Sequence, residues 1–513
     1  MYASVQGIAL YGLEGFTVGV EADIHAGLPN FEIVGLPASS VREAKERVRS
    51  AIVNSGLVWP RARITVSLSP ADWRKDGSGL DLPIAVALLI ASEQVPPVGR
   101  NAILLGELAL DGTLRTFRGV WAATQAAYYL KTQTIVLPLH SEIDPPPPET
   151  GARLLPASSL QEALDLLLGR TTPNTIEHGT SNDNEAALST AAVAVQLDFA
   201  DVVSHEQAKR ALTIAAVGSH HLLMNGPPGS GKSMLAARLP SILPLMSEAE
   251  AAEVKRIFSV AGIHPPLRGI RPFRAPHHTV TATGMLGGGT HPHPGEVSLA
   301  HNGVLFLDEF PEFSRSALEG LRQPLETGEI TVSRAAYSCV FPSQFQFVAA
   351  MNPCPCGYAG SSNHHACRCS IRDRERYRAK LSGPLLDRID MTLWIEGIDT
   401  QRLLVQHHRP QSADSSALIR AQVTAARSFR REREAWLQEI THDPPRNPAG
   451  WLTSYDIAKS GADMLFRGAQ SLQLSIRSLH KVAKVARSTA DLEGSTQVTE
   501  THIAEALQYR SYT

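Results

Sequence analysis

Long apolar runs, secretory features and an excess of either charge are all missing from this sequence. Its longest apolar run, residues 82–91, is about half of a membrane span. The first residues lack the basic region and long apolar run of a signal peptide. Because 48 Lys and Arg residues nearly balance 50 Asp and Glu residues, no global field indicates a nucleic-acid partner, although local loops could still bind DNA. We therefore expect a globular, cytoplasmic protein without membrane contact.

Cysteine is scarce too, with five residues in 513. Four of them form one short segment, C-x-C, ten residues, then C-x-C, which argues against a disulfide framework. Four thiolates in two close pairs match a closed tetrahedral zinc site. The predicted zinc ligands are Cys354, Cys356, Cys367 and Cys369. His364 or His365 could replace one cysteine, and reduced thiols or a redox pair are the alternatives.

A glycine-rich segment follows the short apolar run 222–224, which predicts a buried strand. The segment matches G-x-x-x-x-G-K-[ST] at every fixed position, the pattern of a phosphate-binding P-loop. Its backbone N–H groups can face a polyphosphate at the positive end of the following helix. Lys232 would reach the β- and γ-phosphates of a nucleoside triphosphate, and Ser233 would ligate magnesium. The predicted phosphate-binding residues are Gly226, Pro227, Pro228, Gly229, Ser230, Gly231, Lys232 and Ser233.

Two acids follow the next buried strand. Residues 304–307 are all apolar and end in Asp308 and Glu309. A parallel strand of this kind delivers the acids to its carboxyl end, beside the P-loop. Asp308 would hold magnesium through water, and Glu309 would orient and deprotonate the attacking water. A later strand, residues 345–351, ends in Asn352, which can touch the γ-phosphate or that water, so the sequence predicts nucleotide hydrolysis.

Residues 1–170 alternate strand-like and helix-like stretches. Residues 31–34 and 64–68 predict strands. Between them, residues 39–54 predict one helix, because their apolar positions share a single helical face. This alternation predicts a first domain of mixed α and β structure.

Two stretches of this first domain, KDGSGLDLPIAVALL (75–89) and GELALDGTLRTFRGV (106–120), resemble the protease domain of Lon. That family works with a Ser–Lys dyad. Its serine position falls at or beside Ser78, out of register, and residues 120–123 are Val-Trp-Ala-Ala where the lysine would stand. We therefore expect a Lon-like fold that lacks the catalytic dyad, since no lysine can deprotonate the serine.

The rest of the chain divides into three segments. Residues 171–195 are polar and poor in large apolar side chains, which predicts a flexible linker. An ATPase core is expected over residues 196–398 and a helical lid over residues 399–513, with helices at 471–489 and 500–508.

Two insertions are expected in the ATPase core. A Gly-, His- and Pro-rich insertion, residues 271–303, includes one possible short strand at 279–281. Residues 329–334 and 338–342 predict a hairpin with Arg334 near its tip, where a cation could contact DNA phosphates.

The P-loop, the Asp-Glu strand, the terminal asparagine, the run Asp387–Asp390 (DRID) and the helical lid together resemble the AAA+ ATPases. The two insertions narrow the resemblance to magnesium-chelatase ATPase subunits and MCM helicases. With the Lon-like front half and the cysteine segment, nearly the whole chain resembles the ComM/YifB, or magnesium-chelatase-like, family. The resemblance implies an α/β protein: a Lon-protease-like α+β domain, then an AAA+ P-loop α/β domain with a helical lid.

The family resemblance also implies a function. Members are bacterial homohexamers that use ATP and Mg²⁺ as DNA helicases or translocases and drive branch migration during homologous recombination in natural transformation. By the family pattern, Arg388 is the arginine finger that reaches the neighbouring subunit's γ-phosphate, and Arg477 is the sensor-two arginine of the lid. Single-stranded and branched DNA are the implied partners. The alternative is a magnesium-chelatase-like ATPase that remodels a partner protein for metal insertion.

Overall fold

The computed structural model describes residues 1–99, 101–141, 143–173, 197–202, 204–267, 269–289, 292–334, 337–360, 366–397, 415–440 and 454–510. At residues 334, 337 and 436–440 it describes the backbone alone. The chain divides into two compact units, Met1–Ala191 with Ala252–Pro265 and Ala192–Ala251 with Pro266–Thr513. Beyond residue 173 the predicted linker lies outside the described residues, and so does the predicted boundary between core and lid at residue 398.

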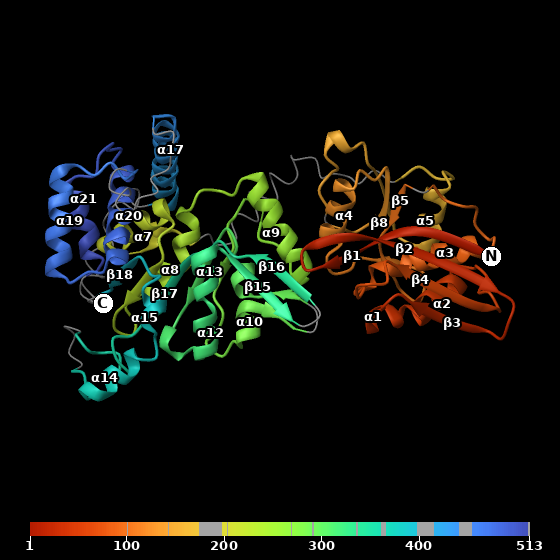
Figure 1. Ribbon diagram of the computed structural model, residues 1–513, viewed down its shortest axis with the longest axis horizontal. Helices are drawn as coiled ribbons and strands as arrows, with labels where there is room; N and C mark the ends of the chain where they lie inside the picture. The colour runs from red at the N-terminus through yellow and green to blue at the C-terminus, as the bar shows by residue number, and fades with distance from the viewer. Residues whose placement is uncertain are drawn as a thin grey trace. The chain divides into compact units, whose positions relative to one another are not determined.

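The first unit is built on a seven-stranded sheet of order β3-β4-β2-β1-β5-β8-β9 (Figure 1, red to orange). Its strands are β1 Tyr2–Tyr11, β2 Glu14–His25, β3 Asn30–Val34, β4 Arg63–Ser69, β5 Ala102–Leu104, β8 Thr134–Pro138 and β9 Arg153–Ala157. A separate two-stranded ribbon pairs β6 Glu107–Leu108 with β7 Leu114–Arg115. The strands predicted at residues 31–34 and 64–68 are confirmed as β3 and β4.

The helices of the first unit are α1 Ser39–Arg42, α2 Ala44–Asn54, α3 Asp81–Ala91, α4 Val120–Tyr129 and α5 Leu160–Leu167. Helix α3 contains the longest apolar run and is buried on nearly all sides, which explains why it is apolar all round. The prediction of a single helix over residues 39–54 is wrong at Glu43, where the chain divides into α1 and α2. Contacts at Ser40, whose hydroxyl donates to Asp76 and whose carbonyl accepts from Arg47, hold the first turn apart as α1.

The second unit contains a five-stranded parallel sheet of order β11-β14-β17-β10-β18. Its strands are β11 Phe273–Arg274, β14 Val304–Leu307, β17 Gln346–Met351, β10 Leu222–Asn225 and β18 Met391–Trp394. The strands predicted at 222–224, 304–307 and 345–351 are confirmed as the three central strands. Because all strands are parallel, the segments that follow β10, β14 and β17 leave the sheet at one edge.

The helices that belong to this core are α7 Glu206–Gly218, α8 Lys232–Ile242, α10 Ala282–Leu286, α11 Glu296–Leu299, α12 Arg315–Gly320, α13 Arg322–Thr327, α14 Ile371–Arg378 and α15 Gly383–Leu386. Helix α9, Glu248–Ala261, begins in the second unit and ends in the first. Within the first unit its Lys255 ammonium lies 2.6 Å from the Asp144 carboxylate. No pattern in the sequence indicated this second crossing between the units.

Two hairpins project from the core. The predicted one is confirmed as β15 Glu329–Arg334 paired with β16 Tyr337–Pro342. The strand predicted at residues 279–281 is wrong, because Thr281 instead caps α10 by accepting a hydrogen bond from the Gly284 N–H. The strands of this insertion are β12 Gly287–Gly288 and β13 His293–Pro294.

The lid consists, within the described residues, of α17 Ser416–Ile440, α19 Lys459–Ser471, α20 Ile476–Leu492 and α21 Glu500–Gln508 (Figure 1, blue). These helices share one apolar core with α7 and β10. The helix predicted at 500–508 is confirmed as α21, with Thr499 in a capping box. The one predicted at 471–489 starts too early, since Ser475 caps α20. No described helix is long and apolar enough to cross a membrane.

Candidate nucleotide-binding site

The P-loop curls between β10 and α8. Gly229 and Gly231 have φ angles of 73° and 84°, which residues with a Cβ atom rarely adopt. Helix α8 begins at Lys232, and no side chain caps its amino end. The first N–H groups of the helix are therefore left for an anion, as in other helix-terminal phosphate sites.

Lys232 bridges the P-loop and the end of β17. Its buried ammonium donates to the carbonyl oxygens of Gly226 and Pro227, both at 2.8 Å. It also lies 3.3 Å from the side-chain oxygen of Asn352. Burial lowers the pKa of Lys232, and the Asp308 carboxylate opposes that shift. The amine is thus held where a phosphate entering the loop would replace its carbonyl partners.

Ser233 and Asp308, the two predicted magnesium ligands, are in direct contact. The Ser233 hydroxyl donates to Asp308 Oδ2 at 2.5 Å, and Asp308 Oδ1 accepts from the Glu309 N–H at 2.9 Å. Hydroxyl and carboxylate oxygens are the hard ligands that magnesium prefers, so this pair fits the ion. Bound there with ATP, the ion would neutralise charge on the β- and γ-phosphates.

A cavity of about 410 Å³ lies at this edge of the sheet, within the range of roughly 300–1,000 Å³ typical of ligand sites. Its lining residues are Pro228, Gly229, Ser230, Gly231, Lys232, Ser233, Met234, Asp308, Glu309, Met351 and Asn352. Six of the eight predicted phosphate-binding residues and the four predicted catalytic residues of the P-loop and strand ends line it. Gly226 and Pro227 contribute by holding Lys232.

His278 is a contact of the site that the sequence reasoning missed. Its Nδ1 lies 3.2 Å from Glu309 Oε2, and its ring packs edge-on against Phe313. Glu309 itself has a positive φ of 50°, a strained conformation for a glutamate. The Gly- and His-rich insertion therefore reaches the carboxylate predicted to be the catalytic base. A pattern of paired histidines was visible in the sequence, but nothing in its spacing indicated this partner.

Arg388 and Arg477 lie away from this cavity. Arg388 donates to the carboxylate of Glu326 on α13 and, at 2.8 Å, to the carbonyl of Pro384. Arg477, at the start of α20, lies 3.8 Å from the same Glu326 carboxylate. Neither arginine lines the nucleotide cavity of its own chain. The predicted arginine finger and the predicted sensor-two arginine therefore contact the same exposed glutamate.

Lys481, one turn after Arg477 on α20, holds the segment that carries Arg388. Its ammonium donates to the carbonyls of Asp387 and, at 2.9 Å, Ile389, the two neighbours of Arg388. It also lies 3.6 Å from the Asp390 carboxylate. Burial lowers the pKa of Lys481 from its usual 10.5 to about 8. One lid helix thus carries one of these arginines and fixes the loop of the other.

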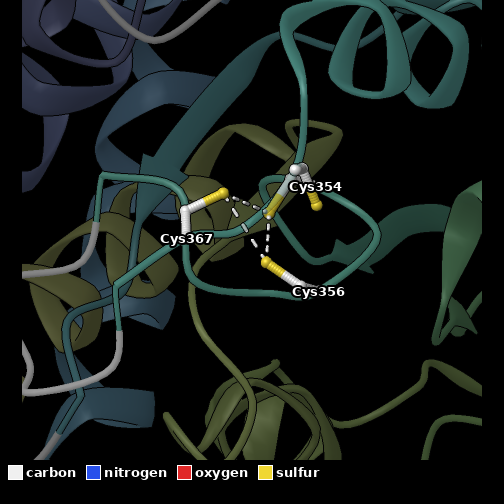
Figure 2. A group of neighbouring side chains, drawn as sticks. Cys354, Cys356 and Cys367 are labelled. Carbon is white, nitrogen blue, oxygen red and sulfur yellow. Dashed lines mark hydrogen bonds between the residues drawn. The ribbon is translucent and has the colours of Figure 1, made fainter.

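The four predicted zinc ligands form one cluster. Their sulfur atoms all lie within 4.8 Å of one another. Figure 2 shows Cys354, Cys356 and Cys367 pointing toward a common centre. The sulfur atoms of these three residues lie 3.3–3.6 Å apart. Those distances are too long for a disulfide, and Zn–S bonds of about 2.3 Å in a tetrahedron separate sulfurs by about 3.8 Å. Four thiols in this arrangement fit zinc, whereas His364 and His365 lie outside the described residues.

One thiol of the cluster is already acidified by its surroundings. A hydrogen bond from the Tyr358 N–H is the main cause that lowers the pKa of Cys356 to about 6. The thiolate is the form that ligates metal. A structural zinc ion bound here would anchor the loop that leaves Asn352, since Cys354 comes two residues later.

In the first unit, the position of the Lon-like serine holds no amine–hydroxyl dyad among the described residues. The Ser78 hydroxyl donates to the Glu107 carboxylate. The fully buried Lys75 donates instead to the Trp73 carbonyl at 2.8 Å. A Cβ at Gly79 would meet the Phe117 ring at 2.6 Å, so that ring covers the turn. The residues around Ser78 are therefore arranged for packing and hydrogen bonding.

Arg334 ends β15, where its backbone pairs with Tyr337 across the hairpin turn. Its side chain lies outside the described residues, so the predicted DNA contact stays a prediction.

The parallel sheet, the P-loop, the Ser233–Asp308 pair and the helical lid together define an AAA+ P-loop ATPase. Three family models match the chain: "Magnesium chelatase, subunit ChlI" over residues 198–403, "Subunit ChlI of Mg-chelatase" over 20–141, and "Magnesium chelatase, subunit ChlI C-terminal" over 413–510. Membership of this class implies that the protein hydrolyses ATP with Mg²⁺.

The relatives of the chain cover nearly its whole length. It is 40% identical to YifB of Escherichia coli over 98% of this chain and 96% of that protein. It is 39% identical to competence protein ComM of Haemophilus influenzae over 99% of this chain and 97% of that one. Lon protease 2 of Bacillus subtilis is 26% identical over 39% of this chain and 41% of its own. The chain belongs to the ComM/YifB family of magnesium-chelatase-like AAA+ ATPases.

Proposed function

We propose that this protein is a hexameric, ATP-dependent DNA helicase or translocase that promotes branch migration during homologous recombination in natural transformation. Near full-length similarity to a protein named competence protein ComM supports the biological setting. The cytoplasm is the compartment in which such a protein would work. Its cofactors would be ATP and Mg²⁺ at the P-loop, with a structural zinc ion in the cysteine cluster.

The observation that carries the ring is the position of Arg388. An arginine finger must reach the γ-phosphate, yet Arg388 and Arg477 both contact Glu326 and neither lines the cavity of their own chain. A site built from one P-loop and a neighbour's arginines explains why the two are gathered on a surface glutamate. Closed rings of identical subunits supply such a neighbour to every site.

DNA would be held by the two inserted hairpins, β12–β13 and β15–β16. Arg334 stands next to the turn of the second hairpin, where a cation can reach backbone phosphate without a base contact. Sequence-independent contacts of this kind suit a motor that must move along any DNA.

A magnesium-chelatase-like remodelling ATPase is the second candidate, because all three family models are named for the chelatase subunit. Such a protein would act on a partner protein and would not touch DNA. ATP hydrolysis measured with and without single-stranded DNA separates the two, since only a DNA motor should be stimulated.

The decisive experiment uses three-stranded and four-way junction DNA with the purified protein, with and without ATP. We expect ATP-dependent strand-exchange products from wild-type protein and none from Glu309→Gln. Absence of products together with absence of DNA-stimulated hydrolysis would contradict the DNA motor and favour the remodelling ATPase.

A further inference from the structure

Positive charge is concentrated in a segment that includes the last two cysteines of the cluster and continues beyond them. Residues 366–380 contain six basic and only two acidic side chains, in a chain whose net charge is −2. The basic residues are Arg368, Arg372, Arg374, Arg376, Arg378 and Lys380. Helix α14 presents four of them, and in Figure 1 it lies at the lower margin of the second unit. We call residues 366–380 the basic arm.

The basic arm is held rigidly at its base. Helix α14 starts directly after Ser370, which forms a reciprocal capping box with Asp373. Arg374 donates to the Cys369 carbonyl at 3.2 Å, which ties the helix to the cysteine cluster. On the inner side Tyr377 is buried, and Lys380 forms an ion pair with Glu312 at 2.8 Å. These contacts fix the helix in place, and the charges of the remaining arginines take no part in them.

The outward arginines are not neutralised within the part of the chain that the structure describes. Arg372 and Arg378 are exposed, and neither has an ion-pair partner among those residues. Of the two acids of the arm, Asp373 is engaged with Ser370 through its capping bonds. Like charges one turn apart, such as Arg372 and Arg376, destabilise a helix. Helix stability alone does not account for this sequence, which points to an anionic ligand.

The chemistry of the surface favours nucleic acid over protein. Arginine forks bind phosphate oxygens in pairs, and protein–DNA interfaces are polar and strongly basic. A protein partner needs an apolar centre, whereas Ile371 is the arm's one large exposed apolar side chain among its described residues.

Part of the basic arm also faces the catalytic centre. Arg368 and Arg376 line a depression of about 530 Å³ that has Glu309 and Asn352 in its wall. Lys380 and the carboxylates of Glu312 and Asp373 line it as well. An anion held by the arm would thus lie next to the residues predicted to act on the attacking water.

We propose that the basic arm is a second nucleic-acid-binding element, which grips backbone phosphates independently of the β15–β16 hairpin. The inference rests on the proposed DNA function and adds a binding surface to it.

The test is Arg372→Gln/Arg378→Gln, since both residues are exposed and lie outside the nucleotide cavity. Arg42→Gln/Arg49→Gln, on exposed positions of the first unit, removes the same charge and serves as the control. Binding of a fluorescent single strand is measured over a range of salt concentrations, with basal ATPase and sedimentation alongside. We expect the Kd of the arm variant to rise about tenfold, and its salt slope to fall by about 0.7 for each phosphate that the arm no longer neutralises.

Arg372→Lys/Arg378→Lys guards against a folding artefact, because it keeps the charge and should retain most of the binding. A Kd and salt slope equal to those of the control variant would overturn the basic arm while leaving the DNA motor intact. Failure of the wild-type protein itself to bind DNA would overturn both proposals. If the arm variant no longer self-associates, the arm is instead an interface with a second copy, which would overturn the nucleic-acid assignment.

Discussion

The backbone of Glu309 has a left-handed conformation that glutamate rarely adopts. Its φ of 50° is unusual for a residue with a Cβ, and its carboxylate, on a side chain that is 58% exposed, lies 3.2 Å from His278 Nδ1. Strain of this kind persists only when the surroundings impose it. We infer that His278 sets the direction of the carboxylate and thereby the place where water can be activated.

His278→Ala should lower kcat for ATP about tenfold with an unchanged KM, because the base remains but loses its orientation. Glu309→Gln, which removes the base itself, should lose about 10²–10⁴ in kcat and retain bound nucleotide. His264→Ala, at an exposed position outside the nucleotide cavity, is the control, because the His277 ring lies 4.0 Å from that of His278 and its removal would disturb His278 too. Equal kinetics for the two histidine variants would contradict a positioning role for His278.

At the scale of single residues, the sequence predicted contacts that a motif encodes. The Ser233–Asp308 hydrogen bond joins positions 75 residues apart. The motifs alone predicted that both residues would lie at one magnesium site. His278 was missed because Gly- and His-rich sequence has no periodicity from which a partner follows. Glu326, which meets Arg388 and Arg477, had no motif either.

At the scale of elements, α20 connects the lid to the Arg388 loop through Lys481. A buried ammonium with two carbonyl acceptors and one carboxylate is a costly arrangement to keep in a helix–loop contact. Because Lys481 donates to the carbonyls on both sides of Arg388, we infer that a movement of the lid would also shift this arginine.

Lys481→Met should bind ATP normally and hydrolyse it at least about tenfold more slowly, because the Arg388 loop is no longer fixed. Lys484→Met, three residues after Lys481 on the same helix, is the control. Because the pKa of Lys481 is lowered from 10.5 to about 8, the unfolded chain binds more protons between those two pH values. Stability from this group therefore rises with pH over that window in wild-type protein, and urea unfolding of Lys481→Met should lack this dependence.

The cysteine cluster begins on the segment that leaves the carboxyl end of β17, with Cys354 two residues after Asn352. We expect elemental analysis to find one zinc ion per chain, and metal removal to slow ATP hydrolysis, because Cys354 follows Asn352 so closely. Cys354→Ser/Cys367→Ser should lose the metal, whereas Cys339→Ser, outside the cluster, should keep it. Freshly purified protein without zinc would show that the four thiols serve another purpose.

Helix ends and interruptions were the least predictable elements. Apolar periodicity indicated one helix over residues 39–54 and another over 471–489. The spacing of apolar residues does not show where a capping side chain begins or interrupts a helix. Ser475 corrects the start of the second helix by capping α20, and tertiary bonds at Ser40 divide the first. The central strands were predictable because a short apolar run that ends in polar residues is typical of a buried parallel strand.

At the scale of the whole molecule, the family resemblance supplied the architecture, and the structure adds where the two predicted arginines lie relative to the nucleotide cavity of the same chain. The nucleotide cavity gathers Lys232, Asp308, Glu309 and Asn352 but no arginine among the described residues. Arg388, whose side chain is only 13% exposed, instead donates to Glu326, and this hydrogen bond is the chief cause that lowers the pKa of Glu326. Arg477 lies 3.8 Å from the same carboxylate. Under the proposed ring, a subunit of this design would need a neighbour to hydrolyse ATP.

Arg388→Ala should therefore bind ATP normally and lose about 10³–10⁵ in turnover, the range for an arginine finger. Lys232→Ala should lose nucleotide binding as well as turnover. Mixing the two inactive variants should restore part of the activity, because a site with the P-loop of one and the arginine of the other is complete. Sedimentation must first show that the variants assemble together. Co-assembled but inactive mixtures would mean that Arg388 works within its own chain. That result would contradict the main argument for a ring of subunits.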